Sequence, residues 1–381
     1  MKKILLIAAA VLTTAAVNAK VWRVNPNEAA IPDFLSVTDA TAAKKVNAGD
    51  TLYIEAGTYA GDQRITKSQL TLIGPGWEIP TNFGSTSTIA TAYFTGDLNV
   101  AADTITLVGL KMAYISLRYQ DIRDLTIERC MIGRITSENL NYDRTIKNIT
   151  IRNNFFNSNL YGNNGPVLSF RSTGYILNVS VENNLFVNYS EASEAWDYAT
   201  MIIIQASTPT NTSAQIAHNT IICKMGYTGH RDVIEAAQTV IRDNIIINTT
   251  TYGDYNNLYL QTYDPISTCE FYNNVLSIPA ENAPDDLKEH FANNFYGATL
   301  SNTFTQTILN NAEETYFMLK DGSVAAGKAY MHEDCGAFAG SWPFIVNGRP
   351  KGLPYIYDVL APNYPTDNQM NISFKVKANN L

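Results

Sequence analysis

Cysteine, histidine and tryptophan are scarce in this sequence, with four residues of each. The cysteines are Cys130, Cys223, Cys269 and Cys335, and no two of them have the CxxC spacing typical of a structural zinc site. Four cysteines allow three disulfide pairings in an oxidising compartment. We expect instead that they are buried free thiols, packed as small apolar groups.

The sequence also lacks an excess of positive charge and, after its first residues, any long apolar run. Its formal net charge is −8, whereas a nucleic-acid-binding protein needs a basic face. We therefore expect no nucleic-acid partner, although an anionic substrate would need only a local Arg or Lys. No later apolar run reaches the length that spans a bilayer, so we expect no membrane span.

Residues 1–19 have the parts of a secretory signal peptide. Lys2 and Lys3 form a positive start, residues 4–11 are apolar, and residues 17–19 supply a small-residue cleavage site. The residue directly after this site is Lys20 and not a cysteine, so we expect no lipid anchor there. The prediction is an exported protein, in the periplasm, at the cell surface or outside the cell, whose mature chain has lost two positive charges.

Six short segments repeat one pattern, in which a polar pair ending in Asn separates two apolar stretches. The last residues of these pairs are Asn154, Asn184, Asn219, Asn244, Asn274 and Asn294. They lie 20 to 35 residues apart, a period that predicts a solenoid of short β-strands. Asn at a fixed turn tolerates the left-handed backbone conformation and can hydrogen-bond to the Asn of the next coil. The repeat therefore predicts an Asn ladder, with His218 as a turn residue beside it and not a ligand or a base.

The pattern continues toward the N-terminus, where Cys130 takes the place of the ladder Asn. Apolar residues alternate with outward ones in these segments, as in half-buried strands. The outward residues Glu128, Arg152 and Glu182 alternate in sign, which predicts a surface ladder of ion pairs of small energetic value.

We divide the chain into three parts. The signal peptide at 1–19 precedes one solenoid domain at 20–340, in which residues 37–46 form a short capping helix, because the ends of a solenoid need caps. Residues 341–381 are punctuated by proline and glycine. They contain two strand-like runs, 354–360 and 371–377, which we expect to pair as a hairpin appendage that covers the last coil.

Three stretches carry a resemblance to a known superfamily. They are Gly49-Asp50-Thr51-Leu52-Tyr53-Ile54-Glu55-Ala56-Gly57-Thr58-Tyr59, the glycine-containing strand at 70–76, and the coils that end in Asn. With them the chain resembles the right-handed parallel β-helix proteins of the pectate-lyase-like superfamily. It is most similar to exported β-helix proteins of Bacteroides-type gut bacteria, which also carry a Gly-Ala-Phe segment, here Gly336-Ala337-Phe338.

The resemblance covers nearly all of residues 20–381 and implies an all-β fold, a right-handed parallel β-helix with an Asn ladder, an N-terminal cap and a C-terminal β appendage. It implies no single activity, because the superfamily includes lyases, hydrolases, adhesins and proteins of unknown role. The function must therefore be argued from the residues of a site.

The longer coils gain their extra residues at one corner, at 157–166, 188–200, 224–232 and 249–257. We expect these loops to stack into a wall, since binding residues concentrate on loops that a rigid scaffold positions. Aromatic side chains with a polar edge suit sugar rings. The loop aromatics that we expect to contact a sugar are Trp196, Tyr198, Tyr227 and Tyr255; the alternative is that they are ordinary surface residues.

After each loop a strand resumes with an outward polar residue. These residues are Arg118, Thr136, Arg171, Gln205, Glu235 and Gln261. We expect them to form one exposed column beside the loop wall. Such a groove suits an extended polymer, with Gln205 and Gln261 as substrate-binding residues.

The densest titratable cluster joins this column. A polysaccharide lyase neutralises a uronate carboxylate with Arg or Lys, often with Ca²⁺ held by carboxylates, and removes the neighbouring proton. The candidate catalytic residues are Arg171, Lys224, His230, Arg231, Asp232 and Glu235. A hydrolase needs two carboxylates at a defined separation, for which Glu235 with Asp232 or Asp197 could serve. No family catalytic signature is present, and a solvated polar loop is the simpler interpretation.

Two hypotheses follow. The first is an exported carbohydrate-active protein that binds an acidic polysaccharide, with cleavage by β-elimination left open. The second is a non-catalytic surface or extracellular protein that uses the solenoid as a rigid glycan-binding or structural platform. We assign no metal ligand, although calcium fits the first hypothesis and the acidic loop of Glu191, Glu194 and Asp197 could hold a cation. We expect a monomer.

Overall fold

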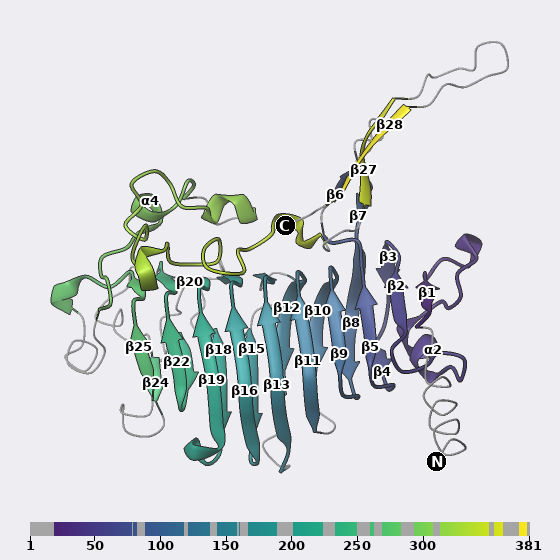
Figure 1. Ribbon diagram of the computed structural model, residues 1–381, viewed down its shortest axis with the longest axis horizontal. Coiled ribbons are helices and arrows are strands. Elements are labelled where there is room, and N and C mark those ends of the chain that lie inside the picture. Colours follow the sequence, from purple (N-terminus) through teal and green to yellow (C-terminus); the bar gives the residue numbers. More distant parts are fainter. Residues whose placement is uncertain are drawn as a thin grey trace, which may run out of the picture.

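The computed structural model describes residues 19–77, 79–81, 88–117, 121–137, 143–157, 160, 167–188, 201–223, 233–249, 260–262, 269–282, 293–307, 313–349, 354–360 and 373–378. Most of their regular structure is strand, arranged in two large sheets whose neighbouring strands all run parallel (Figure 1). The sheets wind into a parallel β-helix, so the prediction of an all-β solenoid is confirmed.

The first sheet contributes one strand to each coil and has ten strands. Their order follows the chain: β1 (Val21–Val24), β2 (Thr51–Ile54), β5 (Leu70–Ile73), β9 (Ile105–Val108), β11 (Ile122–Glu128), β13 (Thr145–Arg152), β16 (Tyr175–Glu182), β19 (Thr212–Ala217), β22 (Thr239–Arg242) and β25 (Glu270–Tyr272). The register pairs Leu125 with Ile149 and Ile149 with Val179. The inward columns read from the sequence are thus real columns.

The second sheet has fourteen strands and bends around a corner of the coil. One arm consists of β14 (Phe155–Asn157), β17 (Leu185–Asn188), β20 (Thr220–Cys223), β23 (Ile245–Asn248) and β26 (Val275–Leu276). The other consists of β15 (Leu168–Ser172), β18 (Ile202–Ala206), β21 (Ile234–Ala236) and β24 (Leu260–Thr262). The N-terminal coils add β3 (Gly57–Tyr59), β4 (Gln63–Ile65), β8 (Ala92–Val100), β10 (Lys111–Ser116) and β12 (Met131–Thr136). Because β12 pairs with both β14 and β15, it joins the two arms.

The long loops predicted from coil length lie mostly outside the described residues, but the strand ends that precede them are described. Asn188, Cys223 and Asn248 are register partners at the ends of β17, β20 and β23. The chain therefore leaves these three strands at the same edge of the β-helix, and the wall of loops stays a prediction.

The Asn ladder is confirmed from Asn154 to Asn294. Each ladder Asn donates from Nδ2 to Oδ1 of the next one, at 2.9 to 3.1 Å, and the same oxygen accepts the preceding Asn backbone N–H. Cys130 extends the file, since its backbone N–H donates to Asn154 Oδ1. One detail of the prediction is wrong. The left-handed backbone conformation belongs to the residue before each ladder Asn, for example Asn183 with φ 52° and His218 with φ 52°.

The interior is filled by stacked side chains from successive coils. Phe156 and Phe186 stack with ring centroids 4.4 Å apart and rings nearly parallel. The four cysteines are buried and free, as expected. Burial raises the pKa of Cys130 and of Cys223 to about 12.

A short helix caps the N-terminal end, as the sequence predicts, but it ends at Ala42 and not at residue 46. Helix α2 (Val37–Ala42) begins at Ser36, whose side chain accepts the Asp39 backbone N–H. Its buried face packs into the same core as the first strands. Thr38 and Thr41 of this helix hydrogen-bond to β4, at Arg64.

Residues 324–349, which we call the strap, run back along the turns that follow the first sheet. Figure 1 shows this segment crossing from the C-terminal coils toward the N-terminal ones. At its far end, Asn347 O accepts the Trp77 backbone N–H at 3.0 Å. The predicted domain boundary after residue 340 falls inside the strap, and that division stays a prediction.

The C-terminal hairpin forms but does not take the expected place. Strand β27 (Pro354–Leu360) pairs antiparallel with β28 (Ser373–Ala378). Figure 1 shows both in the N-terminal half of the solenoid, far from β25. The antiparallel pair β6 (Ile79–Thr81) and β7 (Thr88–Ala90) forms a separate two-stranded sheet. The expectation that the hairpin covers the last coil is wrong, because the strap first carries the chain back along the solenoid.

The remaining elements are short. They are helix α4 (Leu300–Thr303) and the 3₁₀ turns Glu28–Ala30, Pro209–Asn211, Ala280–Asn282, Glu314–Phe317, Tyr330–His332 and Val346–Gly348. No helix in the described ranges is long and apolar enough to cross a membrane.

Candidate functional site

Three of the predicted site residues have described side chains: Arg171 on β15, Gln205 on β18 and Glu235 on β21. Gln261 on β24 is placed by its backbone alone. The other predicted residues lie outside the described residues: Lys224, His230, Arg231, Asp232, Trp196, Tyr198, Tyr227 and Tyr255, together with Arg118 and the acidic loop. Their roles stay predictions.

The register divides the predicted single column into two rows. Arg171 is the partner of Gln205, but Glu235 is the partner of Ile203, two residues earlier on β18. Gln261 aligns with Glu235. Thr136 pairs with Ser169 and so belongs to the row of Glu235, two residues away from the row of Arg171 and Gln205. The expectation of one exposed column is therefore wrong in register and in exposure, since Thr136 and Glu235 are both buried.

The same register brings Arg171 and Glu235 together diagonally across β18. Arg171 Nη2 lies 3.1 Å from Glu235 Oε2, forming both a hydrogen bond and an ion pair. The Glu235 side chain is 8% exposed and that of Arg171 is 28% exposed. A guanidinium with a long stem can span two strands, so a two-residue offset still produces contact.

A hydroxyl fixes the backbone under Arg171. Ser137 Oγ accepts the Arg171 N–H at 2.8 Å and donates to the Arg171 carbonyl at 3.0 Å. Buried Arg144 stabilises the chain next to Ser137, because its guanidinium donates to the carbonyls of Ser137 and Leu117. Arg171 therefore projects from a rigid position.

The guanidinium retains capacity for a ligand. Among the described residues its ion pair is through Nη2 alone, and the side chain is partly exposed. A guanidinium carries five N–H donors in a fork that matches a carboxylate. The arrangement can therefore bind an anion beside Glu235, while Gln205 offers an amide on the neighbouring strand.

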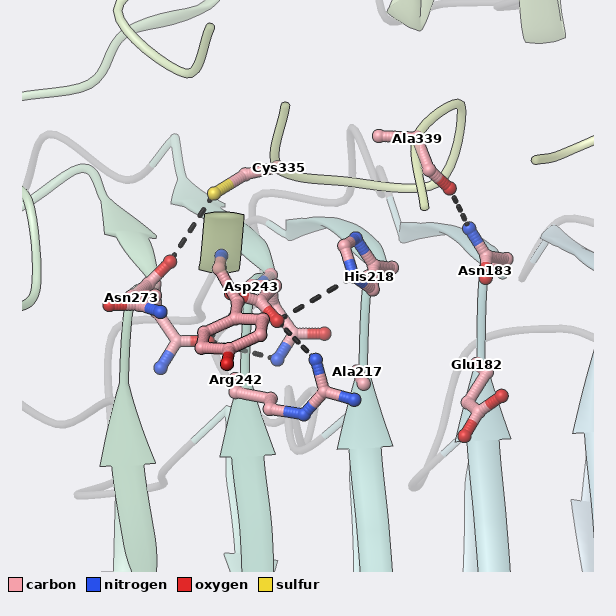
Figure 2. A network of polar contacts seen from close by, with 12 residues as sticks. Glu182, Asn183, Ala217, His218, Arg242, Asp243, Asn273, Cys335 and Ala339 are labelled. Carbon is pink, nitrogen blue, oxygen red and sulfur yellow. Dashed lines mark hydrogen bonds and ion pairs between the residues drawn. The ribbon is translucent and has the colours of Figure 1, made fainter. Parts of the chain in front are cut away.

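A second polar region lies where the strap crosses the left-handed turns (Figure 2). The residues at these turns hold it. Asn153 donates to the Trp342 carbonyl at 3.0 Å, and Asn183 donates to the Ala337 and Ala339 carbonyls. Between strap and turns is a cavity of about 290 Å³ that Glu182, His218 and Trp342 help to line.

Asp243 is the electrostatic centre of this region. Its side chain is fully buried, and it accepts the Tyr330 backbone N–H at 3.0 Å through Oδ1. Its Oδ2 contacts the Arg242 guanidinium and lies 3.5 Å from His218 Nε2. Burial lowers the pKa of His218, and the charge of Asp243 opposes that shift.

The sequence interpretation missed this region. It placed His218 correctly at a turn, but it treated the polar residue before each ladder Asn as part of the ladder. A signal was present: a column of Asn, His and Asp at left-handed turns is a row of side chains that can hydrogen-bond to a crossing segment. Nothing in the strap sequence alone specifies that it returns along this row.

The described residues contain no group of three or more His, Cys, Asp or Glu side chains that could hold a metal ion. The acidic loop proposed for a cation is outside those residues, so calcium binding stays a prediction.

No protein-family model and no curated protein matches the sequence. A search of solved structures finds a PL6 family alginate lyase, AlyGC, with 13% sequence identity and a TM-score of 0.25. The match covers 87% of this chain and 60% of the lyase chain, so the protein spans less than two thirds of that enzyme's length.

Proposed function

We propose that this protein is an exported, monomeric β-helix protein that binds an acidic polysaccharide across the outward face of β15, β18 and β21. The observation that carries the proposal is the Arg171–Glu235 pair, a cation held rigidly beside a carboxylate on that face. A uronate chain presents a carboxylate on each sugar and hydroxyls between them. The guanidinium fork binds the former, and Glu235 and Gln205 accept from the latter.

Strand spacing supports an extended ligand. Parallel strands lie about 4.8 Å apart, so β15 to β21 spans roughly 10 Å, about the length of two sugar rings. A linear polymer lying across the strands meets the same backbone frame at every coil. The predicted loop aromatics Trp196, Tyr198, Tyr227 and Tyr255 belong to this proposal as the wall of the groove.

The reaction class that suits such a site is β-elimination. A cation neutralises the uronate carboxylate, and a base removes the proton from the carbon that bears this carboxylate. The glycosidic oxygen on the next ring carbon then leaves with its bonding electron pair and is protonated, and a double bond forms between the two carbons. Arg171 would supply the first role. The base would come from Lys224, His230, Arg231, Asp232 or Glu235.

The ion pair also favours a second candidate function, a non-catalytic glycan-binding platform. Glu235 already accepts a hydrogen bond from Arg171, so this carboxylate is engaged before any ligand arrives. A protein of this kind would bind the polymer and leave its length unchanged.

One experiment tests the proposal and separates the two functions. The full chain is incubated with a panel of polyuronates, alginate among them, with and without Ca²⁺, while binding and the ultraviolet absorbance of the unsaturated product are recorded. Arg171→Met should reduce polyuronate affinity at least ten-fold, whereas Arg123→Met, at an exposed arginine outside the groove, should not. Binding without product selects the platform; neither binding nor product on any polymer rejects both.

A further inference from the structure

The strap cavity is the strongest unassigned feature of the molecule. Its volume of about 290 Å³ is at the lower end of the range for ligand sites, a size that suits one sugar ring. We propose that it is a second saccharide site, which binds a single neutral sugar residue. This site uses none of the residues of the proposed polyuronate groove.

An aromatic face supplies the apolar part of the site. Trp342 lines the cavity and is 51% exposed. Its carbonyl is fixed by Asn153, and the Arg152 guanidinium lies 4.4 Å from the centre of its ring. Because Arg152 covers one face of the ring, a sugar would stack on the opposite face, and a half-exposed indole that is anchored in this way is preorganised for that contact.

Two polar side chains that are held in place supply the hydrogen-bonding groups of the site. Glu182 is oriented by Gln215, whose Nε2 donates to Glu182 Oε1 at 2.7 Å. Arg242 is held by buried Asp243. A carboxylate accepts hydrogen bonds from adjacent hydroxyls and a guanidinium donates to them, so both can contact the rim of a sugar ring whose face lies on Trp342.

The charge balance selects a neutral ligand. Three carboxylates, Glu182, Glu333 and Asp243, face His218 in this region, against one guanidinium, Arg242. This excess of negative charge disfavours a uronate. Arg242 lines the cavity and Arg152 lies over the tryptophan ring, so positive charge is placed beside the proposed position of the sugar ring, which disfavours a cationic sugar there.

The site forms only when the strap lies against the coils. Trp342 and Glu333 come from the strap, while Glu182 and Arg242 come from β16 and β22. Neither half forms the site alone. Sugar binding should therefore also hold the strap in place, because a ligand that binds only when the strap lies on the coils stabilises that arrangement.

The test uses saturation-transfer NMR and calorimetry on the full chain with glucose, galactose and mannose, and with galacturonate and glucosamine as charged counterparts. At least one neutral sugar should bind saturably and more tightly than the charged sugars of the same panel. Trp342→Ala should weaken that binding at least ten-fold. Tyr175→Ala removes an equally exposed aromatic side chain from β16, outside the cavity lining, and should leave it unchanged.

Glu182→Gln keeps the shape of the side chain and leaves the strap unaltered. It therefore tests the site even if Trp342→Ala detaches the strap. It should weaken sugar binding several-fold while the melting temperature stays within a degree or two of wild type. Saturable binding that survives both substitutions, tighter binding of galacturonate or of glucosamine, or no binding of any neutral sugar would each overturn the proposal. Arg171→Met separates the two sites, since it should reduce polyuronate affinity at least ten-fold and leave the affinity for the neutral sugar unchanged.

Discussion

Asn183 donates from Nδ2 to two carbonyls of the strap, those of Ala337 and Ala339, which follow it by 154 and 156 residues. The side chain can do so because its backbone is in the left-handed conformation, with φ 52°. A turn residue of the solenoid therefore fixes a segment from the far end of the chain.

This contact gives a test of how the strap is held. Asn183→Ala should lower the free energy of unfolding by about 2 to 4 kcal/mol, since it leaves one buried and one part-buried carbonyl without their donor and places a Cβ-bearing residue without a polar side chain at positive φ. Asn183→Gly also removes the hydrogen bonds, but glycine adopts a positive φ without strain. The free energy of unfolding should therefore fall by about half as much as in Asn183→Ala. Urea unfolding followed by circular dichroism measures both. Equal losses in the two variants would contradict the role of backbone strain.

The interior of the Asn ladder should tolerate substitution less than its end. Asn219 donates to Asn244 and to the Val181 carbonyl and accepts from Asn184, all in buried surroundings. Asn219→Ala should cost about 3 kcal/mol or more, because several buried groups lose partners at once. Asn294→Ala, at the part-buried end of the file, should cost clearly less. Thermal and urea midpoints of the two variants decide this, and a reversed order would contradict it.

Periodicity explains why the coils and the ladder could be predicted. A strand that alternates apolar and outward residues fixes which side chains stack, so the pairing of Ile149 with Val179 follows from the sequence. The ladder follows as well, because an Asn at one turn of every coil has its partner in the next coil.

The site was harder to predict, because register within a coil depends on where each strand begins after a loop. An apolar–polar pair marks β18 and β21 equally, yet Glu235 aligns with Ile203 and not with Gln205. The strap path is set by hydrogen bonds to backbone carbonyls, as at Trp342 and Ala339. Any residue can supply a carbonyl, so this path leaves no residue pattern in the strap.

The Arg171–Glu235 pair should contribute measurably to stability without its ligand. A double-mutant cycle with Arg171→Met and Glu235→Gln should give a coupling free energy of about 1 kcal/mol, at the upper end of partly exposed pairs. The matched control is the pair of Arg123 and Asp121, whose side chains are about half exposed. Its coupling should be a few tenths of a kcal/mol. Unfolding in urea measures both cycles, and equal couplings would argue against a positioned pair.

His218 should make stability depend on pH. Burial lowers its pKa against the opposing charge of Asp243, so the unfolded chain takes up a proton at higher pH than the folded protein. The contribution to the free energy of unfolding is fully present above about pH 6.5, the ordinary value for histidine. It is lost as the pH falls below this value toward the lowered pKa of the folded state.

The His218 prediction can be measured at the residue itself. The NMR signal of its imidazole Cε1–H, assigned by its loss in His218→Asn, should titrate below the ordinary histidine range. The same variant should flatten the fall in the unfolding midpoint between about pH 7 and pH 5. His332→Asn, at an exposed histidine of the strap, should leave that fall intact. A normal titration of His218 would contradict its burial under the strap.

The cysteines should be unreactive until the solenoid opens. Burial raises the pKa of Cys130 and of Cys223 to about 12 and raises that of Cys335 as well, so almost no thiolate is present at pH 8, and reagents also lack access. Iodoacetamide should label none of the four in the folded protein and all four in denaturant, counted by mass spectrometry of the intact chain. Cys335, which the strap presses against the Asn273 carbonyl at 3.3 Å, should label first at intermediate urea concentrations, because the strap can detach while the coils stay stacked. Earlier labelling of Cys130 or Cys223 would show that the coils open before the strap.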